Sequence, residues 1–177
     1  RVYYELRRRG VEIPWPIQVE YARQEVPVDT PERRQRFKRA IAAVPLLGGL
    51  PEDVHSELAA DAEERLFADG EVIVREGDAG GSMFLVSRGR VVITVGADRR
   101  EMAVTPAGGY FGEMSLLTGE ARTATVVAQT DVVLLELDRP SFARMFEEHP
   151  GLAQQLSALL AQRKSELKAA VSHLETT

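Results

Sequence analysis

The residues with the clearest chemical potential lie in a glycine-rich segment at 108–125, GGYFGEMSLLTGEARTAT. Glu113 and Arg122, nine residues apart, place one carboxylate and one guanidinium on a compact loop. The carboxylate can accept hydrogen bonds from hydroxyl groups and the guanidinium can bind a phosphate, so the pair suits a phosphorylated sugar. The alternative interpretation is a salt bridge between the two side chains.

The backbone of the same segment also suits an anion. Glycine at 112 allows a ligand to approach the main chain closely. Residues 112–115 can form one short helical turn, whose exposed N–H groups would face an anion. The segment therefore predicts a binding loop held between two strands.

Catalysis and metal binding are not indicated. The chain has no cysteine, and His55, His149 and His173 are too widely spaced for a zinc site. No nucleophile, base and orienting group can be assembled from the motifs, and the acidic pair Glu147 and Glu148 is interpreted as a solvated helix end. We expect a protein that is not an enzyme and holds no metal.

Charge is distributed unevenly over the 177 residues. The net charge is −5, but residues 1–41 carry +4 and the remainder −9. An acidic main body argues against a nucleic-acid surface, because phosphate backbones are bound by clustered lysine and arginine. No apolar run approaches the roughly 20 residues that a membrane helix requires.

The middle of the chain is predicted to be β-rich. Ten of the fourteen glycines fall between Gly70 and Gly119, among short runs of branched and aromatic residues, as in antiparallel sheets. Alternation places Val91, Ile93 and Val95 on one face of a half-buried strand. The predicted strands are 71–75, 82–87, 91–95, 101–104, 123–128 and 132–137.

Helices are predicted on both sides of the strands. One begins at Thr30, with Pro31 in its first turn, and runs toward residue 43. A short second helix begins at 51–53 and carries Val54, Leu58 and Ala62 on one face. A third runs from an Asp138 cap to residue 148.

A final helix is predicted from Leu152 to about Leu174. Its apolar positions have heptad-like spacing, interrupted by Arg163. The helix either packs its apolar face on its own domain or mediates self-association.

Beyond these patterns, the segment 108–125 resembles the phosphate-binding cassette of cyclic nucleotide-binding domains. Three upstream segments resemble the family's helical turn and early strands, in the same order and at similar spacing: 44–51, 70–78 and 83–91. The resemblance extends over residues 42–174. It implies an α+β fold, an antiparallel, jelly-roll-like β-roll of about eight strands flanked by N-terminal helices and a C-terminal lid helix.

The resemblance also implies the residues of a site for cAMP or cGMP as ligand. Gly112 and Glu113 match the family's Gly-Glu, whose acid holds the ribose 2′-hydroxyl, and the backbone donors of Met114 and Ser115 would point at the phosphate. Arg122 matches the phosphate-binding arginine.

Four further positions follow less directly from the resemblance. Thr123 matches a small hydroxyl residue that donates to phosphate and, in some relatives, to a guanine edge; Ala121 stands where the family often has proline. Arg163 occupies the place of a basic lid residue or is a surface arginine. Val104 and Phe111 are expected to line the pocket or to pack in the core.

The first thirty residues suggest a setting for this domain. Residues 10–21, GVEIPWPIQVEY, resemble the end of the cytoplasmic domain of small-conductance mechanosensitive channels, although the Pro-x-Pro element also suits an extended spacer. We accordingly divide the chain into a channel-like tail (1–28), a basic helical linker (29–41) and the cyclic nucleotide-binding domain (42–177). The chain is then a fragment, lacking its pore, of the cytoplasmic part of a bacterial inner-membrane channel.

The resemblance to channels implies a homo-heptamer for the full protein. The alternatives are a truncated transcription regulator, a kinase regulatory subunit, or a degenerate module that binds no nucleotide and serves in structure or oligomerisation. The preference for cAMP over cGMP rests on the bacterial character of the match. The residues do not indicate whether nucleotide opens or closes the pore.

Overall fold

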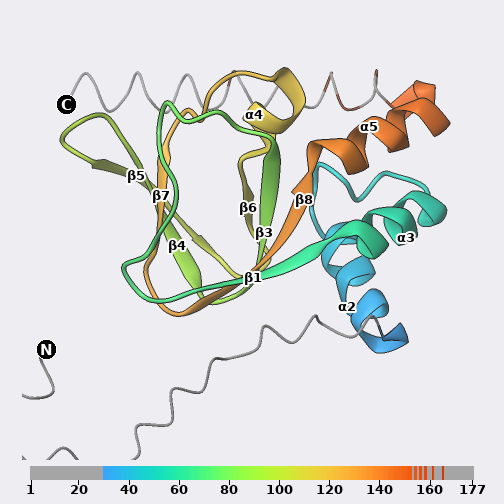
Figure 1. The fold of residues 1–177 in the computed structure, drawn as a ribbon, viewed down its shortest axis with the longest axis horizontal. Helices are drawn as coiled ribbons and strands as arrows, with labels where there is room; N and C mark the ends of the chain where they lie inside the picture. Colours follow the sequence, from blue (N-terminus) through green and yellow to red (C-terminus); the bar gives the residue numbers. More distant parts are fainter. Residues whose placement is uncertain are drawn as a thin grey trace, which may run out of the picture.

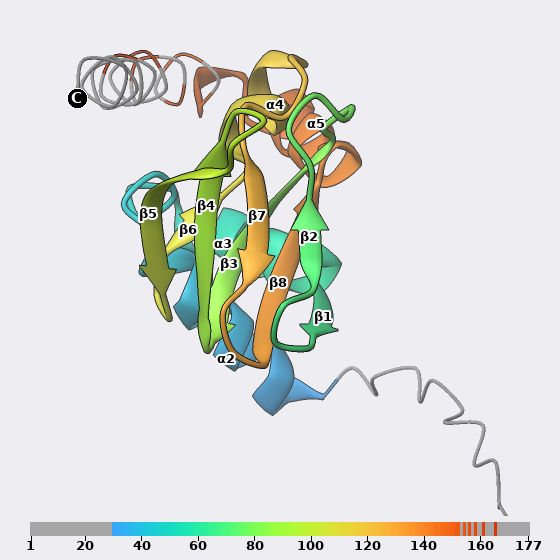
Figure 2. The same ribbon diagram turned by 90° about the vertical axis from the view of Figure 1, so that its left-hand side faces the viewer.

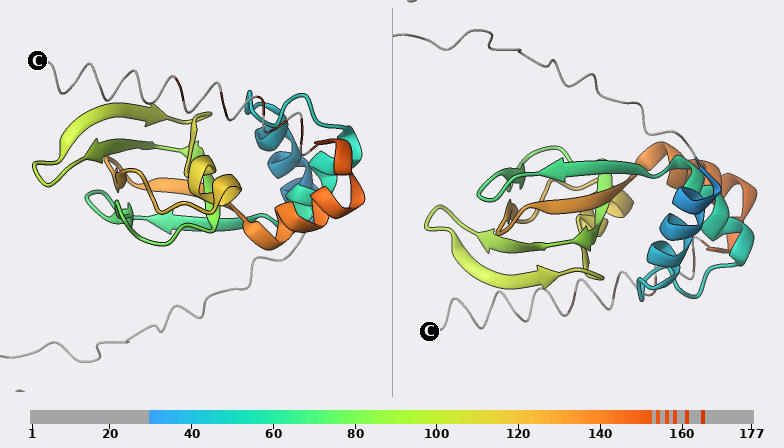
Figure 3. Two further views of the ribbon diagram at one scale, coloured as in Figure 1. Left: turned by 90° about the horizontal axis from the view of Figure 1, so that it is seen from above. Right: turned by 90° about the horizontal axis from the view of Figure 1, so that it is seen from below.

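The structure is a computed structural model, and it describes residues 30–152 together with residues 154, 156, 158, 161 and 165. Its described strands form two four-stranded antiparallel sheets, which face each other as two layers (Figure 3). Helices α2 (Pro31–Ala42), α3 (Glu52–Asp61) and α5 (Arg139–Glu148) gather at one end of the roll (Figure 1). The predicted α+β β-roll is confirmed.

One sheet has the order β1-β8-β3-β6 and the other the order β2-β7-β4-β5, the latter visible side by side in Figure 2. Both mix strands from the two halves of the β region, so the roll closes only through long-range pairing. The strands, in chain order, are β1 (Glu63–Phe67), β2 (Val72–Val74), β3 (Ser82–Arg88), β4 (Arg90–Val95), β5 (Arg100–Pro106), β6 (Tyr110–Phe111), β7 (Thr125–Ala128) and β8 (Val132–Asp138).

Two apolar cores lie on opposite faces of the first sheet. Within the roll, Phe84 and Leu134 pack with residues of the second sheet such as Val126. On the other face, Met83 and Leu135 pack with the helices. Because β3 and β8 are covered on both faces, they consist of nearly continuous apolar residues rather than alternating ones.

The predicted helix starts are confirmed by their capping bonds. Thr30 accepts a hydrogen bond from the backbone N–H of Arg33 at 3.2 Å, and Asp138 accepts one from that of Ser141 at 3.0 Å. Asp and Thr satisfy N–H groups that the first helical turn leaves unpaired. Helix α3 buries Val54 and Leu58 as predicted, with Ala62 buried just beyond its end.

The six predicted strands correspond to β2, β3, β4, β5, β7 and β8, with ends that differ by at most two residues. The strand predicted at 123–128 begins only at Thr125, because Arg122 is tied to another loop: its N–H donates to Asp78 O and its carbonyl accepts from Gly77 N, both at 2.8 Å. Strands β1 and β6 were not among the predicted runs. In β4, Val91 is buried but Ile93 and Val95 are only half-buried, next to a shift in register.

The final helix is described only in part. Residues 151 and 152 and the five further described residues are helical, and Leu152 and Leu156 are buried in the core beside the helices. These contacts support packing on its own domain. The other residues of the heptad-like pattern, Arg163 among them, lie outside the described residues. Within the part that is described, no helix is long and apolar enough to cross a membrane.

Candidate functional site

Helix α4 (Glu113–Thr118) is the short helical turn that the sequence predicted. Gly112 begins it in the left-handed region, at φ 85°, and Gly119 ends it at φ 77°. The first backbone hydrogen bond of the helix runs from Leu116 N to Gly112 O, so the N–H groups of Met114 and Ser115 lie before its internal ladder. Both residues are buried.

Arg122 reaches back under this helix. Its Nη1 donates to Ser82 O at 2.6 Å and to Gly112 O at 3.1 Å, and its Nη2 donates to Ser82 Oγ at 3.1 Å. The residue is only 7% exposed. The cassette arginine is therefore fixed by the start of β3 and by the residue that begins α4.

Gly112 is required by this arrangement for two reasons. Its positive φ is strained for any residue with a side chain. A Cβ atom there would also lie 2.6 Å from Arg122 Nη1 and 3.0 Å from Ser82 O. The sequence predicted that this glycine lets a ligand approach the main chain closely. The structure shows that it also lets the Arg122 side chain approach the main chain closely.

The charge of Glu113 acts on the Arg122 guanidinium. Glu113 is 4% exposed. Burial lowers the pKa of the Arg122 guanidinium, and the negative charges of Glu136, Glu113 and Asp78 oppose that shift. The hydrogen bonds of the guanidinium named above go to Ser82 and Gly112 rather than to the Glu113 carboxylate. Glu113 thus contributes charge that stabilises a buried cation.

The remaining predicted positions differ in exposure. Phe111 is buried and stacks on Phe84 with ring centroids 5.2 Å apart, so it belongs to the core inside the roll. Thr123 is exposed. Val104 on β5 is 42% exposed, so the alternative of core packing is wrong for this residue.

Ser82 and Gly80 are the site residues that sequence reasoning missed. Ser82 supplies two acceptors to Arg122. A Cβ atom on Gly80 would lie 2.2 Å from Ser115 Cβ, so the loop before β3 packs directly on α4. Arg122 and Ser82 lie forty residues apart in the sequence. Neither Ser82 nor Gly80 belongs to a local sequence pattern that would have predicted these contacts.

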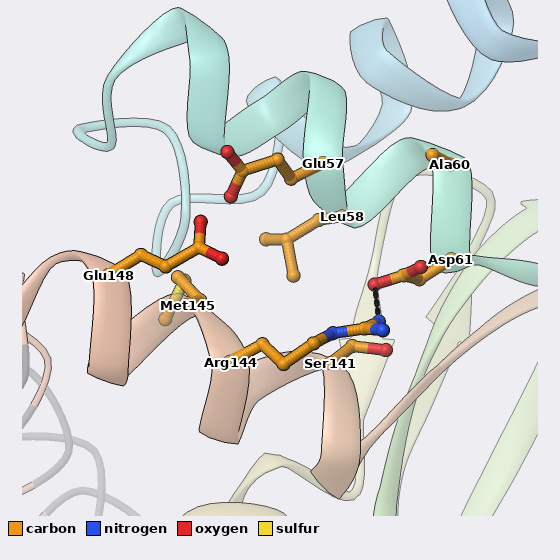
Figure 4. Close-up of a pocket in the computed structure, with 8 residues that line it drawn as sticks. All are labelled: Glu57, Leu58, Ala60, Asp61, Ser141, Arg144, Met145 and Glu148. Carbon is orange, nitrogen blue, oxygen red and sulfur yellow. Dashed lines mark hydrogen bonds and ion pairs between the residues drawn. The ribbon is translucent and has the colours of Figure 1, made fainter.

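Away from this site, a hollow of about 330 Å³ lies between α3 and α5 (Figure 4). An ion pair between Asp61 and Arg144 crosses it, and Glu57 and Glu148 point toward each other. The ligand-type atoms of Glu57, Glu148 and His149 lie within 4.8 Å of one another, a proximity not evident from sequence spacing. Both carboxylates are exposed to water, and we assign the cluster no ligand.

The site thus combines an antiparallel β-roll with a buried arginine next to a short helix that begins at a glycine. A family model, described as the cyclic nucleotide-binding domain, matches residues 64–149. Residues 64–149 therefore belong to the cyclic nucleotide-binding domain family, as the resemblance implied. Domains of this family are regulatory rather than catalytic.

Known relatives come from several kinds of protein. A cyclic nucleotide-gated potassium channel of Rhizobium etli is 35% identical over 135 residues, which is 75% of this chain and 37% of the channel. The regulatory domain of Toxoplasma gondii protein kinase A with cAMP superposes with a TM-score of 0.65, at 29% identity, over 76% of this chain and 51% of that one. The N-terminal domain of a transcriptional regulator from Streptomyces coelicolor superposes with a TM-score of 0.62, at 30% identity, over 74% of this chain and 93% of that one.

The chain spans only part of the curated proteins that it matches. Among the first three, its share of the relative's length lies between 16% and 58%. These relatives are therefore proteins of different overall function, and one part of each is similar to this chain.

Proposed function

We propose that residues 42–177 form a sensor domain that binds a cyclic nucleotide, cAMP in preference to cGMP. The observation that carries the proposal is the placement of Arg122, a buried cation fixed beside the first turn of α4. Three N–H groups of its guanidinium donate to protein acceptors. Within the part of the chain that is described, its Nε–H and one Nη2–H are left to donate to phosphate oxygens.

The other cassette residues have complementary roles in this proposal. The N–H groups of Met114 and Ser115 donate to the cyclic phosphate, and the Glu113 carboxylate accepts from the ribose 2′-hydroxyl. The exposed Thr123 hydroxyl donates to the phosphate. Val104 contacts the ligand as part of the pocket wall.

Three other residues of the proposed site have less direct roles or lie outside the described part of the structure. Phe111 supports the site from the core rather than lining it, since it is 4% exposed. Gly112 acts by allowing the close packing of Arg122. Arg163, which lies outside the described residues, acts as a lid over the base. No metal takes part in this scheme.

We further propose that the domain regulates a bacterial ion channel of the mechanosensitive-like family. Support comes from the Rhizobium etli channel and from the channel-like pattern in residues 10–21. The division into tail (1–28), linker (29–41) and sensor (42–177), a cytoplasmic position and a homo-heptameric full protein belong to this proposal. Gating requires that nucleotide bind two conformations with different affinity, because equal affinity shifts nothing.

A second candidate is the sensor half of a transcription regulator. It is favoured by the Streptomyces coelicolor regulator domain, 93% of which this chain covers. The acidic charge of the main body argues for the channel instead, since residues 42–177 carry −9.

Calorimetric titration with cAMP and, separately, with cGMP tests ligand binding. We expect saturable binding that is tighter for cAMP; flat traces for both nucleotides would contradict the sensor function. Current recordings from the full-length protein test the channel assignment. Currents that do not change with nucleotide would refute that assignment while leaving the ligand result intact.

A further inference from the structure

Arg139, the first residue of α5, connects three separate segments. Its Nη2 donates to Ser115 O in α4 and to Gly80 O in the loop before β3, both at 2.8 Å. Its backbone N–H donates to Gly81 O, also at 2.8 Å. Helices α4 and α5 lie side by side at this point in both Figure 1 and Figure 2. The Arg139 side chain thus links α4 and the loop before β3 to the start of α5.

The two carbonyl groups that accept from Arg139 belong to a tightly packed contact. Gly80 and Ser115 are so close that a side chain at 80 would collide with Ser115 Cβ. Ser115 O also accepts from Gly119 N at 3.1 Å, which ends α4. A cation beside the carbonyl groups of a helix end is favourable. Arg139 therefore holds the carbonyl group of Ser115, in the peptide unit that follows the one carrying the Ser115 N–H.

We propose that Arg139 is the positioning residue of the cassette and couples ligand occupancy to α5. This rests on the proposed function, because the N–H of Ser115, in the residue whose carbonyl Arg139 binds, is one of the proposed phosphate donors. A ligand that pulls on the N–H of Ser115 also moves its helix, and the carbonyl bonds transmit that movement to the first turn of α5. Coupling of this kind is reciprocal, so the position of α5 also alters nucleotide affinity.

Two variants and one matched control test the positioning role without any ligand. Arg139→Gln removes the charge and the paired donors, and Arg139→Lys keeps the charge. Arg144→Gln is the control: Arg144 is an exposed arginine of the same helix whose ion pair goes to Asp61 in α3. We expect the α4 amides to exchange hydrogen about tenfold faster in Arg139→Gln, as for loss of charge-assisted hydrogen bonds. Arg139→Lys should be intermediate, and Arg144→Gln should match the parent. Equal exchange in Arg139→Gln and the parent would overturn the positioning role.

A second measurement tests the coupling with cAMP. We expect Arg139→Gln to bind cAMP about tenfold more weakly, with Arg144→Gln within about twofold of the parent. Binding should also slow exchange of the α5 amides in the parent and in Arg144→Gln but not in Arg139→Gln. If the parent binds cAMP and Arg139→Gln shows the same affinity and the same slowing in α5, the coupling is refuted. If the parent does not bind cAMP, the proposed function and the coupling both fail, and the ligand-independent exchange comparison still decides the positioning role.

Discussion

Arg122 Nη1 lies 2.6 Å from the carbonyl oxygen of Ser82, a contact between residues forty positions apart. With the bond to Ser82 Oγ, it joins the cassette loop to the beginning of β3. The same guanidinium lies 5.8 Å from the ring centroid of Phe84. The proposed phosphate-binding residue is therefore also a structural residue, which changes how it should be tested.

Arg122→Lys should affect both binding and stability. Replacement of Arg122 removes donors from Ser82 O, Ser82 Oγ and Gly112 O, so the fold should lose stability as well as the ligand contact. A lysine keeps the charge but not the fork of donors. We expect a loss of about 1–3 kcal/mol in the free energy of unfolding and at least about tenfold in cAMP affinity.

Urea denaturation and calorimetry measure the two effects of Arg122→Lys. The control is Arg88→Lys, an exposed arginine at the end of β3, which should change neither quantity. Parent-like affinity in Arg122→Lys would remove the residue from the phosphate site.

Glu113→Gln tests the proposed ribose contact through a double comparison. The substitution keeps the size of the side chain and removes the charge of the acceptor. We expect the parent to bind 2′-deoxy-cAMP about tenfold more weakly than cAMP, and Glu113→Gln to discriminate much less between them, because residues in direct contact are non-additive. Equal discrimination by both proteins would show that Glu113 does not contact the 2′-hydroxyl.

Gly80→Ala tests the packing of the loop on α4. Its new Cβ would lie 2.2 Å from Ser115 Cβ, so α4 or the loop must shift. We expect a destabilisation of about 1–3 kcal/mol by urea denaturation, together with weaker cAMP binding. The neighbouring Gly81→Ala is a matched control, since its Cβ would have no neighbour within 4 Å. Similar behaviour of the two variants would contradict the close contact.

Val104→Ala tests whether the Val104 side chain lines the ligand pocket or stabilises the fold. Val104 is 42% exposed, so truncation should leave the free energy of unfolding within about 0.5 kcal/mol of the parent. We expect cAMP affinity to fall about threefold through lost apolar contact. Leu66→Ala, at an exposed large apolar residue of β1, should alter neither. If the affinities of Val104→Ala and Leu66→Ala are the same, Val104 is not part of the wall.

A pH-dependent contact ties α2 to α3. Lys38 Nζ lies 2.6 Å from Glu52 Oε1, and this bond and charge hold the pKa of Glu52 below its usual value. A carboxyl whose pKa is lowered on folding contributes stability above its unfolded pKa, and loses it as the pH falls through the folded value. We expect Lys38→Met to raise the pKa of Glu52 in a carboxyl NMR titration. An unchanged Glu52 titration would mean that Lys38 does not cause the shift.

The helix boundaries and most strands could be predicted from sequence because their signals are local. Thr30 and Asp138 cap helices by bonds to residues three positions away. The cassette is similarly compact, since α4 begins and ends at glycines whose backbone conformation few other residues adopt. The short helical turn and the β-rich middle of the chain were accordingly evident from residue types and spacing, and the family resemblance supplied the fold class.

Strand β1 was missed because its stabilisation is not local. The segment Glu63–Phe67 is rich in charge and has no clear apolar alternation. It becomes a strand by pairing with β8, where Arg65 binds Glu136 across the ladder at 2.8 Å. The two-residue strand β6 is too short for any periodic signal.

The sequence by itself determined the family, through an ordered resemblance along residues 42–174, and the helix caps, through patterns of a few neighbouring positions. Only the tertiary structure decided which distant residues support the cassette. Ser82 accepts from Arg122, Gly80 packs on Ser115, and Arg139 links both segments to α5. Such contacts form when the two sheets close and bring remote backbone carbonyl groups together, and a carbonyl group is present in every residue, so no residue type marks them in advance.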